Sequence, residues 1–248
     1  MPAAPFVLTA ILLAAALPAG SQAADADALP KVIVPAPRDA EWFGYRHAYK
    51  AARFFAPFVK TRSLIQAHMQ IRPLSPDEPM DGLQIELAGE SVHMTIPVDA
   101  LGRATLPMLK QAYDEDAVLR LNRQKGHYRF SGRFSILERD DGEYSVADLH
   151  AACEQVLSAQ RESGYSLHLI GKHCLGVKFV YMPGDMEAQV SYRDSSGTLA
   201  ALAGAPGEPF EGPPMGKYQV VEFRFANWSA QGEVLARSKP LAISALYD

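Results

Sequence analysis

The sequence has little cysteine, little tryptophan and almost no excess of charge. Only two of its 248 residues are cysteine, so at most one intramolecular disulfide can form. It has 28 acidic and 24 basic residues, a formal net charge of -4. Without a basic excess to neutralise phosphates, the chain is not expected to bind nucleic acid. A hydrophobic content of 48% with 21% charged residues is typical of a globular protein and excludes a disordered chain or a multi-pass membrane protein.

The short motifs of several common enzyme classes are also missing. The sequence contains neither the Gly-x-Ser-x-Gly turn of many serine hydrolases nor the Gly-x-x-x-x-Gly-Lys-Ser/Thr phosphate loop. It also lacks Gly-x-Gly-x-x-Gly and His-Glu-x-x-His. No motif therefore points to a serine hydrolase of that type, a nucleotide-binding enzyme or a zinc protease, and no cofactor is expected.

The longest apolar run lies at the N-terminus. Residues 1–23 contain no charged side chain, and Phe6 to Pro18 has the length of a signal-peptide core. Ser21-Gln22-Ala23 fits a small-x-small cleavage site, so we predict a signal peptide at residues 1–23. The run is shorter than the roughly 20 apolar residues that a membrane span needs. We therefore expect a periplasmic or secreted protein with no stable membrane span after cleavage.

Export changes the interpretation of the two cysteines, because exported compartments permit disulfides. A bridge between Cys153 and Cys174 would close a loop of about 20 residues, worth about 3 kcal/mol in the chain-entropy model. The alternative is a metal site formed by His150, Cys153, His173 and Cys174, the ligand types that zinc prefers. Adjacent His173 and Cys174 on a strand would face opposite ways, which disfavours that site. We predict the disulfide.

A first helix is predicted after a proline-rich leader. Residues 24–38 contain three prolines and are expected to be extended. Asp39 can cap a helix that runs to about Ala56, because Pro57 follows. At helical spacing its apolar side chains form two stripes on roughly opposite sides, so the helix needs two contact surfaces.

Aromatic residues supply the candidate binding surface. One stripe begins with Trp42, and the other contains Phe43, His47 and Phe54. The second stripe is either buried against a structural neighbour or exposed as a docking patch. Trp228 could stack on a sugar ring, although a single tryptophan in a β protein is more often part of the core or its rim. The candidate binding residues are Trp42, Phe43, His47, Phe54 and Trp228.

Most of the chain has the pattern of antiparallel strands. Residues 83–87 and 92–96 alternate between apolar and polar side chains, and Ala88-Gly89-Glu90 suits the hairpin turn between them. Ser145 and Asp148 form a capping pair for a second, amphipathic helix that Gly164 closes.

We predict a mainly β protein of the α+β class with two helices, built as two β-sandwich-like regions joined by the amphipathic helix. The N-terminal helix and the first β region would occupy residues 39–144. The second helix and the second β region would occupy residues 145–248.

Two acidic clusters are candidate sites for calcium or for acid–base chemistry. They lie at residues 114–116 and 140–143, and glycosidases need only two suitably spaced carboxylates. Neither cluster has the ligand spacing of an EF-hand loop. Solvated turns between strands are the simpler interpretation.

One stretch resembles a family. Ile96-Pro97-Val98-Asp99 through Leu106-Pro107, followed by residues 113–121 (Tyr-Asp-Glu-Asp-Ala-Val-Leu-Arg-Leu), is similar to exported proteobacterial proteins of unknown function. Those proteins share a signal peptide, an aromatic N-terminal helix and short strands around an acidic segment. The resemblance covers about the first half of the mature chain. It implies a periplasmic setting and no known activity, so no site residue is carried over.

These patterns favour a non-catalytic exported protein of the cell envelope that binds a protein or glycan partner. The first alternative is a periplasmic hydrolase that uses clustered carboxylates or histidines. The second is a metal-binding exported protein that uses the two histidines and two cysteines named above.

Overall fold

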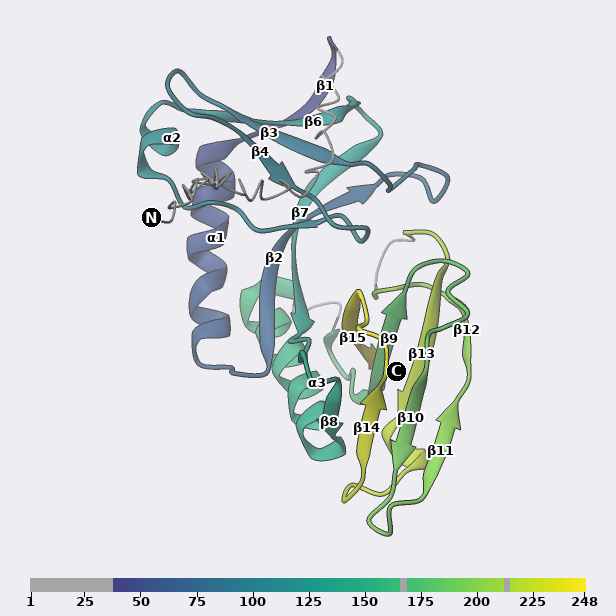
Figure 1. Ribbon diagram of the computed structural model, residues 1–248. Helices are drawn as coiled ribbons and strands as arrows, with labels where there is room; N and C mark the ends of the chain where they lie inside the picture. Colours follow the sequence, from purple (N-terminus) through teal and green to yellow (C-terminus); the bar gives the residue numbers. More distant parts are fainter. Residues whose placement is uncertain (1–37, 166–168, 212–214) are drawn as a thin grey trace, which may run out of the picture. The chain divides into compact units, whose positions relative to one another are not determined.

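The computed structural model describes residues 38–165, 169–211 and 215–248 (Figure 1). The predicted signal peptide at residues 1–23 lies outside the described residues, as does the predicted leader except for its last residue. Three α-helices lie in the described part of the chain, namely α1 (Tyr45–Lys60), α2 (Lys110–Asp114) and α3 (Val146–Gln160). Within it, no helix is both long enough and apolar enough to cross a membrane. The short helix α2 was not predicted.

The strands of the described residues form three antiparallel sheets, which confirms the predicted α+β class. The first sheet has the order β1 (Ala40–Gly44), β6 (Val118–Gln124), β3 (Gln84–Ala88) and β4 (His93–Pro97). The largest sheet has the order β12 (Gly204–Gly207), β13 (Tyr218–Arg224), β9 (Cys174–Tyr181), β15 (Ala242–Tyr247), β7 (Tyr128–Ile136), β2 (Ile65–Pro73) and β5 (Arg103–Ala104). The third has the order β11 (Leu199–Leu202), β10 (Val190–Arg193), β14 (Glu233–Ala236) and β8 (Glu143–Ser145).

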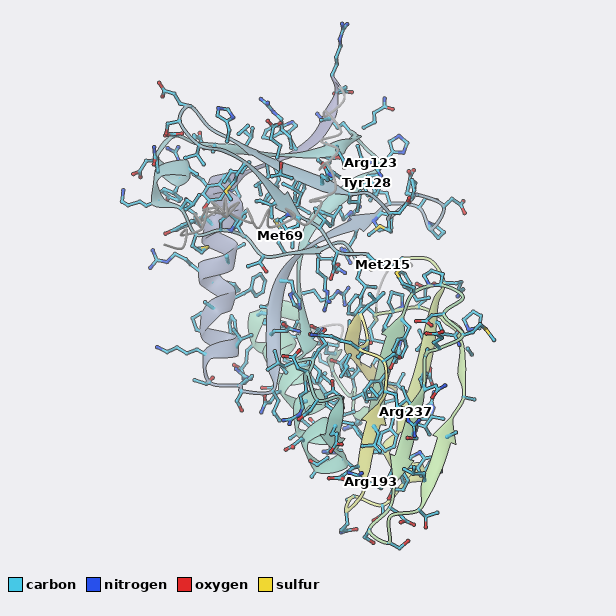
Figure 2. All side chains as sticks on the ribbon, viewed as in Figure 1. Met69, Arg123, Tyr128, Arg193, Met215 and Arg237 are labelled. Carbon is cyan, nitrogen blue, oxygen red and sulfur yellow. A yellow bond between two sulfur atoms is a disulfide. The ribbon has the colours of Figure 1, made fainter. Side chains whose placement is uncertain are left out.

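The seven-stranded sheet takes strands from both predicted β regions. Strands β2, β5 and β7 precede residue 144, whereas β9, β12, β13 and β15 follow it. The two sets meet where Ile136 of β7 pairs with Ile243 of β15. One core cluster surrounds α3 and includes Phe179 and Phe223 of this sheet. A second lies between α1, the first sheet and the ends of β2 and β7, and Tyr128 of β7 belongs to it (Figure 2).

The N-terminal helix begins and ends later than predicted. Residues 40–44 form β1 instead, and Trp42 and Phe43 lie opposite Arg120 and Leu119 of β6. Strand pairing satisfies the backbone there, so α1 begins only after Gly44, and Asp39 caps nothing. Pro57 lies inside α1, in its last turn, where losing one backbone hydrogen bond does not end the helix before Lys60.

The second predicted helix is confirmed. The Ser145 hydroxyl oxygen accepts a hydrogen bond from the backbone N–H of Asp148 at 3.0 Å. A π-helical turn, Arg161–Tyr165, follows α3, and Gly164 within it has a φ of 104°, a conformation that favours glycine. Cys153, fully buried on α3, forms a disulfide with Cys174 at the start of β9, and their Cα atoms are 6.0 Å apart. The disulfide therefore attaches α3 directly to the largest sheet.

We expect Ser145→Ala to lower the free energy of unfolding by about 1 kcal/mol, because it removes the N-cap of α3. Ser145→Asp retains a side-chain acceptor at this position and is expected to stay close to the wild type. Urea denaturation followed by circular dichroism measures both. An equal loss in the two variants would contradict the capping role.

Candidate functional site

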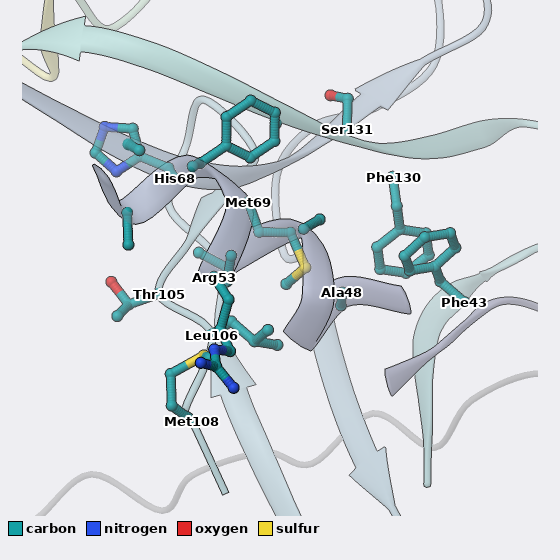
Figure 3. A pocket seen from close by; sticks show the side chains of 17 residues that line it. Phe43, Ala48, Arg53, His68, Met69, Thr105, Leu106, Met108, Phe130 and Ser131 are labelled. Carbon is teal, nitrogen blue, oxygen red and sulfur yellow. The ribbon is translucent and has the colours of Figure 1, made fainter. Parts of the chain in front are cut away.

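An apolar pocket of about 330 Å³ lies between α1 and the strands that it covers, and we call it the α1 pocket (Figure 3). The helix contributes mainly alanines at positions that recur on one face, which are Ala48, Ala51, Ala52 and Ala56. The strands opposite contribute Ala67, Met69, Ala104, Phe130 and Gly132. Because these side chains are mostly small, helix and sheet do not fill the space between them.

The helix touches the sheet closely beside this space. A Cβ atom built on Gly132 of β7 would lie 2.9 Å from the ring of Phe55 on α1, so the ring occupies the position that a larger residue would need. The Phe55 ring also packs edge-on against Phe134. This contact holds α1 against β7 while the neighbouring alanines leave the α1 pocket open.

The two ends of the α1 pocket differ in chemistry. At one end the ring of Phe43 stacks on Phe130, with centroids 5.4 Å apart and an interplanar angle of 16°. At the other end Arg53 of α1 lies beside Met108, and Met69 lies between the two ends (Figure 3). The α1 pocket is therefore apolar along its length and has a cationic side chain at one end.

Two polar residues of β2 and β7 contribute little polar surface to the α1 pocket. The hydroxyl of Ser131 donates to the carbonyl oxygen of Gln70 at 3.0 Å and points away from the α1 pocket (Figure 3). His68 Nε2 lies 2.8 Å from the hydroxyl oxygen of Ser135. Side chains alternate along a strand, so these groups belong to the opposite face of the sheet.

The opposite face of β2 and β7 is polar and partly covered. There Arg133 Nε donates to Gln70 Oε1 at 2.6 Å, and the Arg133 guanidinium lies 4.3 Å from the centre of the Phe210 ring. Gln70 also contacts the sulfur of Met215 at 3.5 Å, and Met215 lies over this face (Figure 2). Arg103 bridges Asp99 at 2.7 Å and Glu138 at 2.8 Å. These contacts bind separate strands and loops together.

The His68–Ser135 pair is the arrangement most similar to a hydrolase site, but its chemistry is unsuited to that role. Ser135 is completely buried. Burial, together with the nearby Arg103 and Arg133 and against the opposing effect of Asp99, lowers the pKa of His68 to about 4. A histidine that activates a serine needs a pKa near the working pH. Within the described residues no carboxylate hydrogen-bonds to His68, so nothing orients the ring as a catalytic base.

The acidic clusters are paired with cations at turns. Asp114 contacts Lys110 at 2.5 Å and Asp116 contacts Arg46 at 3.3 Å. The hydrogen bond from Arg139 and the backbone N–H of Glu143 lower the pKa of Asp141 to about 2. A general acid needs its pKa raised instead. These contacts favour the turn interpretation over the acid–base one.

The alternative metal site at His150, Cys153, His173 and Cys174 is wrong. Both sulfur atoms are used by the disulfide, so no thiolate remains to bind a metal. The His150 ring packs on Phe225 with centroids 4.8 Å apart. In the described ranges, no group of three or more histidine, cysteine, aspartate or glutamate side chains is placed to hold an ion.

The structure does not bring the five predicted binding residues together. Phe43 lines the α1 pocket, whereas Trp42 and Phe54 are 54% and 53% exposed. His47 is exposed, and its ring lies 6.0 Å from that of Phe43. Trp228 packs on Tyr192, with centroids 4.5 Å apart, and so belongs to the rim of the core around α3. The predicted stripes failed because Trp42 and Phe43 lie on β1 and not on the helix.

No protein-family model, curated protein or solved structure matches the chain. The resemblance to exported proteobacterial proteins therefore stays a prediction. Function has to be inferred from the α1 pocket and the groups around it.

Sequence reasoning missed the α1 pocket although a signal for it is present. Alanines at 48, 51, 52 and 56 share one helix face and face Ala67 and Gly132 across the gap. Small side chains on both facing surfaces indicate either very close packing or an unfilled space. The sequence does not decide between these outcomes, because it does not show that β2 and β7 lie opposite α1.

Proposed function

We propose that this protein is a non-catalytic binding protein of the cell envelope and that its α1 pocket holds an apolar part of the ligand. The observation that carries the proposal is an open, apolar volume of about 330 Å³ next to a well-packed core. Small-molecule sites begin at about 300 Å³. An engineered apolar cavity of about 150 Å³ already binds benzene.

The composition of the walls indicates the class of ligand. A glycan needs several hydrogen-bonding groups, whereas the α1 pocket offers mainly alanine, methionine and phenylalanine side chains. Its polar side chains are few. Arg53 lies at one end and Thr105 on the wall, while Ser131 and His68 already have hydrogen-bond partners on other residues. An alkyl or acyl chain fits these walls better than a sugar, and we place such a chain in the α1 pocket.

Absence of catalysis is supported by the distribution of titratable groups. The strongly shifted histidine, His68, borders the α1 pocket but its Nε2 lies against the buried Ser135 hydroxyl, and the Arg103 ion pairs involve no residue that lines the α1 pocket. Export to the periplasm or secretion is supported by the predicted signal peptide and by the disulfide, because cytosolic thiols generally stay reduced.

We expect dodecanol to bind the wild-type protein at one site and Ala52→Phe to weaken this binding about tenfold or more. The added ring would occupy volume that otherwise buries several methylene groups of the ligand. Isothermal titration calorimetry below the solubility limit of dodecanol measures the affinity. Circular dichroism and thermal unfolding establish that the variant is folded.

The matched control is Ala151→Phe, which places the same ring at an exposed position on α3. It is expected to bind dodecanol as the wild type does. Failure of the wild type to bind dodecanol, or equal binding by Ala52→Phe, would contradict the proposal.

A further inference from the structure

A second depression, of about 290 Å³, shares Arg53 with the α1 pocket. It lies between α1 and α2 and is lined by Tyr49, Lys50, Arg53, Lys110, Tyr113 and Asp114. The rings of Tyr49 and Tyr113 pack together with centroids 5.0 Å apart. Because Arg53 lines both spaces, its guanidinium is within reach of a ligand group at that end of the α1 pocket and of the second depression.

The second depression has an excess of positive charge. It contains three cationic side chains, Lys50, Arg53 and Lys110, and one carboxylate, that of Asp114. The carboxylate is already paired with Lys110 at 2.5 Å. Among the described residues, neither Lys50 nor Arg53 has an ion pair or a side-chain hydrogen bond, so two cations remain uncompensated in the part of the molecule that the structure covers.

The pairing of an apolar volume with an uncompensated cationic end is complementary to one kind of small molecule. We infer that the ligand is a free single-chain amphiphile whose alkyl chain lies in the α1 pocket and whose anionic head group contacts Arg53 and Lys50. This inference rests on the proposed function. A guanidinium matches a carboxylate or phosphate with two parallel hydrogen bonds, and an ammonium adds a second charge. A cationic head group would be repelled by the same side chains.

The chain direction follows from the two ends of the α1 pocket. Phe43 and Phe130 close the end away from Arg53 with stacked rings, which suits a terminal methyl group. Arg53 and Met108 lie at the other end (Figure 3). The head group is therefore placed at the Arg53 end, where it also meets the second depression.

The test compares three probes with a common twelve-carbon chain, which are dodecanoate, dodecanol and dodecyltrimethylammonium, all below their micellar concentrations. Calorimetry on the full chain at neutral pH and low salt is expected to show about fivefold tighter binding of dodecanoate than of dodecanol. Dodecyltrimethylammonium is expected to bind most weakly. Arg53→Gln should bring the affinity for dodecanoate to within about twofold of that for dodecanol, with both probes measured on the same variant.

Lys60→Gln is the matched control, because Lys60 is an exposed cation on the same helix that lines neither space. It removes the same charge and is expected to keep the preference for dodecanoate. Equal affinity for the three probes, or an unchanged preference in Arg53→Gln, overturns the inference while dodecanol binding by the wild type still supports the proposed function. If no probe binds, the proposed function fails and the inference fails with it.

Discussion

Removing the disulfide with Cys153→Ala/Cys174→Ala is expected to lower the free energy of unfolding by about 3 kcal/mol. The cross-link joins residues 21 positions apart and so restricts the unfolded chain. Cys153 is also fully buried in the cluster around α3, so its replacement removes packed atoms from the core. Chemical denaturation of the wild type and the variant measures the difference.

A reducing agent provides the control for this prediction. The reducing agent is expected to lower the free energy of unfolding of the wild type by most of these roughly 3 kcal/mol. The free energy of unfolding of the cysteine-free variant should not change, because only the wild type has a disulfide to reduce. A wild type that is insensitive to reductant, together with a variant of undiminished stability, would contradict a structural role for the disulfide.

Acid is expected to destabilise the protein through His68, by about 2 to 3 kcal/mol between pH 7 and pH 4. Burial, with Arg103 and Arg133 nearby, lowers the pKa of His68 to about 4 in the folded protein, whereas an unfolded histidine titrates near 6.5. Above pH 6.5 the imidazole of His68 is mostly neutral in both the folded and the unfolded protein. As the pH falls from 6.5 to 4, the unfolded state takes up the proton first and stability decreases. Below pH 4 the folded state is protonated too, and the loss stops growing.

The contribution of His68 is isolated by comparison with His68→Gln, which does not titrate. The free energy of unfolding of the wild type, relative to that of this variant, should decrease by about 2 to 3 kcal/mol as the pH falls from 7 to 4. His93→Gln, on the exposed side of β4, is the matched control and should follow the wild-type profile. A difference between wild type and His68→Gln that is constant with pH would refute the assignment.

Features that depend on neighbouring residues were predictable from the sequence. The helix α3 follows from the Ser145 cap and the glycine at 164, which act within one or two turns. The hairpin of β3 and β4 follows from alternation and from a turn at Gly89, although Ala88, predicted as part of that turn, belongs to β3 and pairs with His93. With only two cysteines, the disulfide has a single pairing within the chain.

Features that depend on distant pairing were not predictable. Trp42 and Phe43 have helical spacing with later residues, yet they form β1 because β6, nearly eighty positions away, pairs with them. The burial and lowered pKa of His68 could not be predicted from the sequence, because its partners Ser135 and Arg103 come from other elements. The α1 pocket arises from missing side-chain volume between elements whose juxtaposition is visible only in the fold.

The most direct measurement of the central claim is a crystal structure of the protein with dodecanol brominated at its terminal carbon. We expect an anomalous bromine peak inside the α1 pocket, at the end where the rings of Phe43 and Phe130 stack. A bromine peak found only elsewhere on the molecule, with the α1 pocket free of ligand, would contradict it.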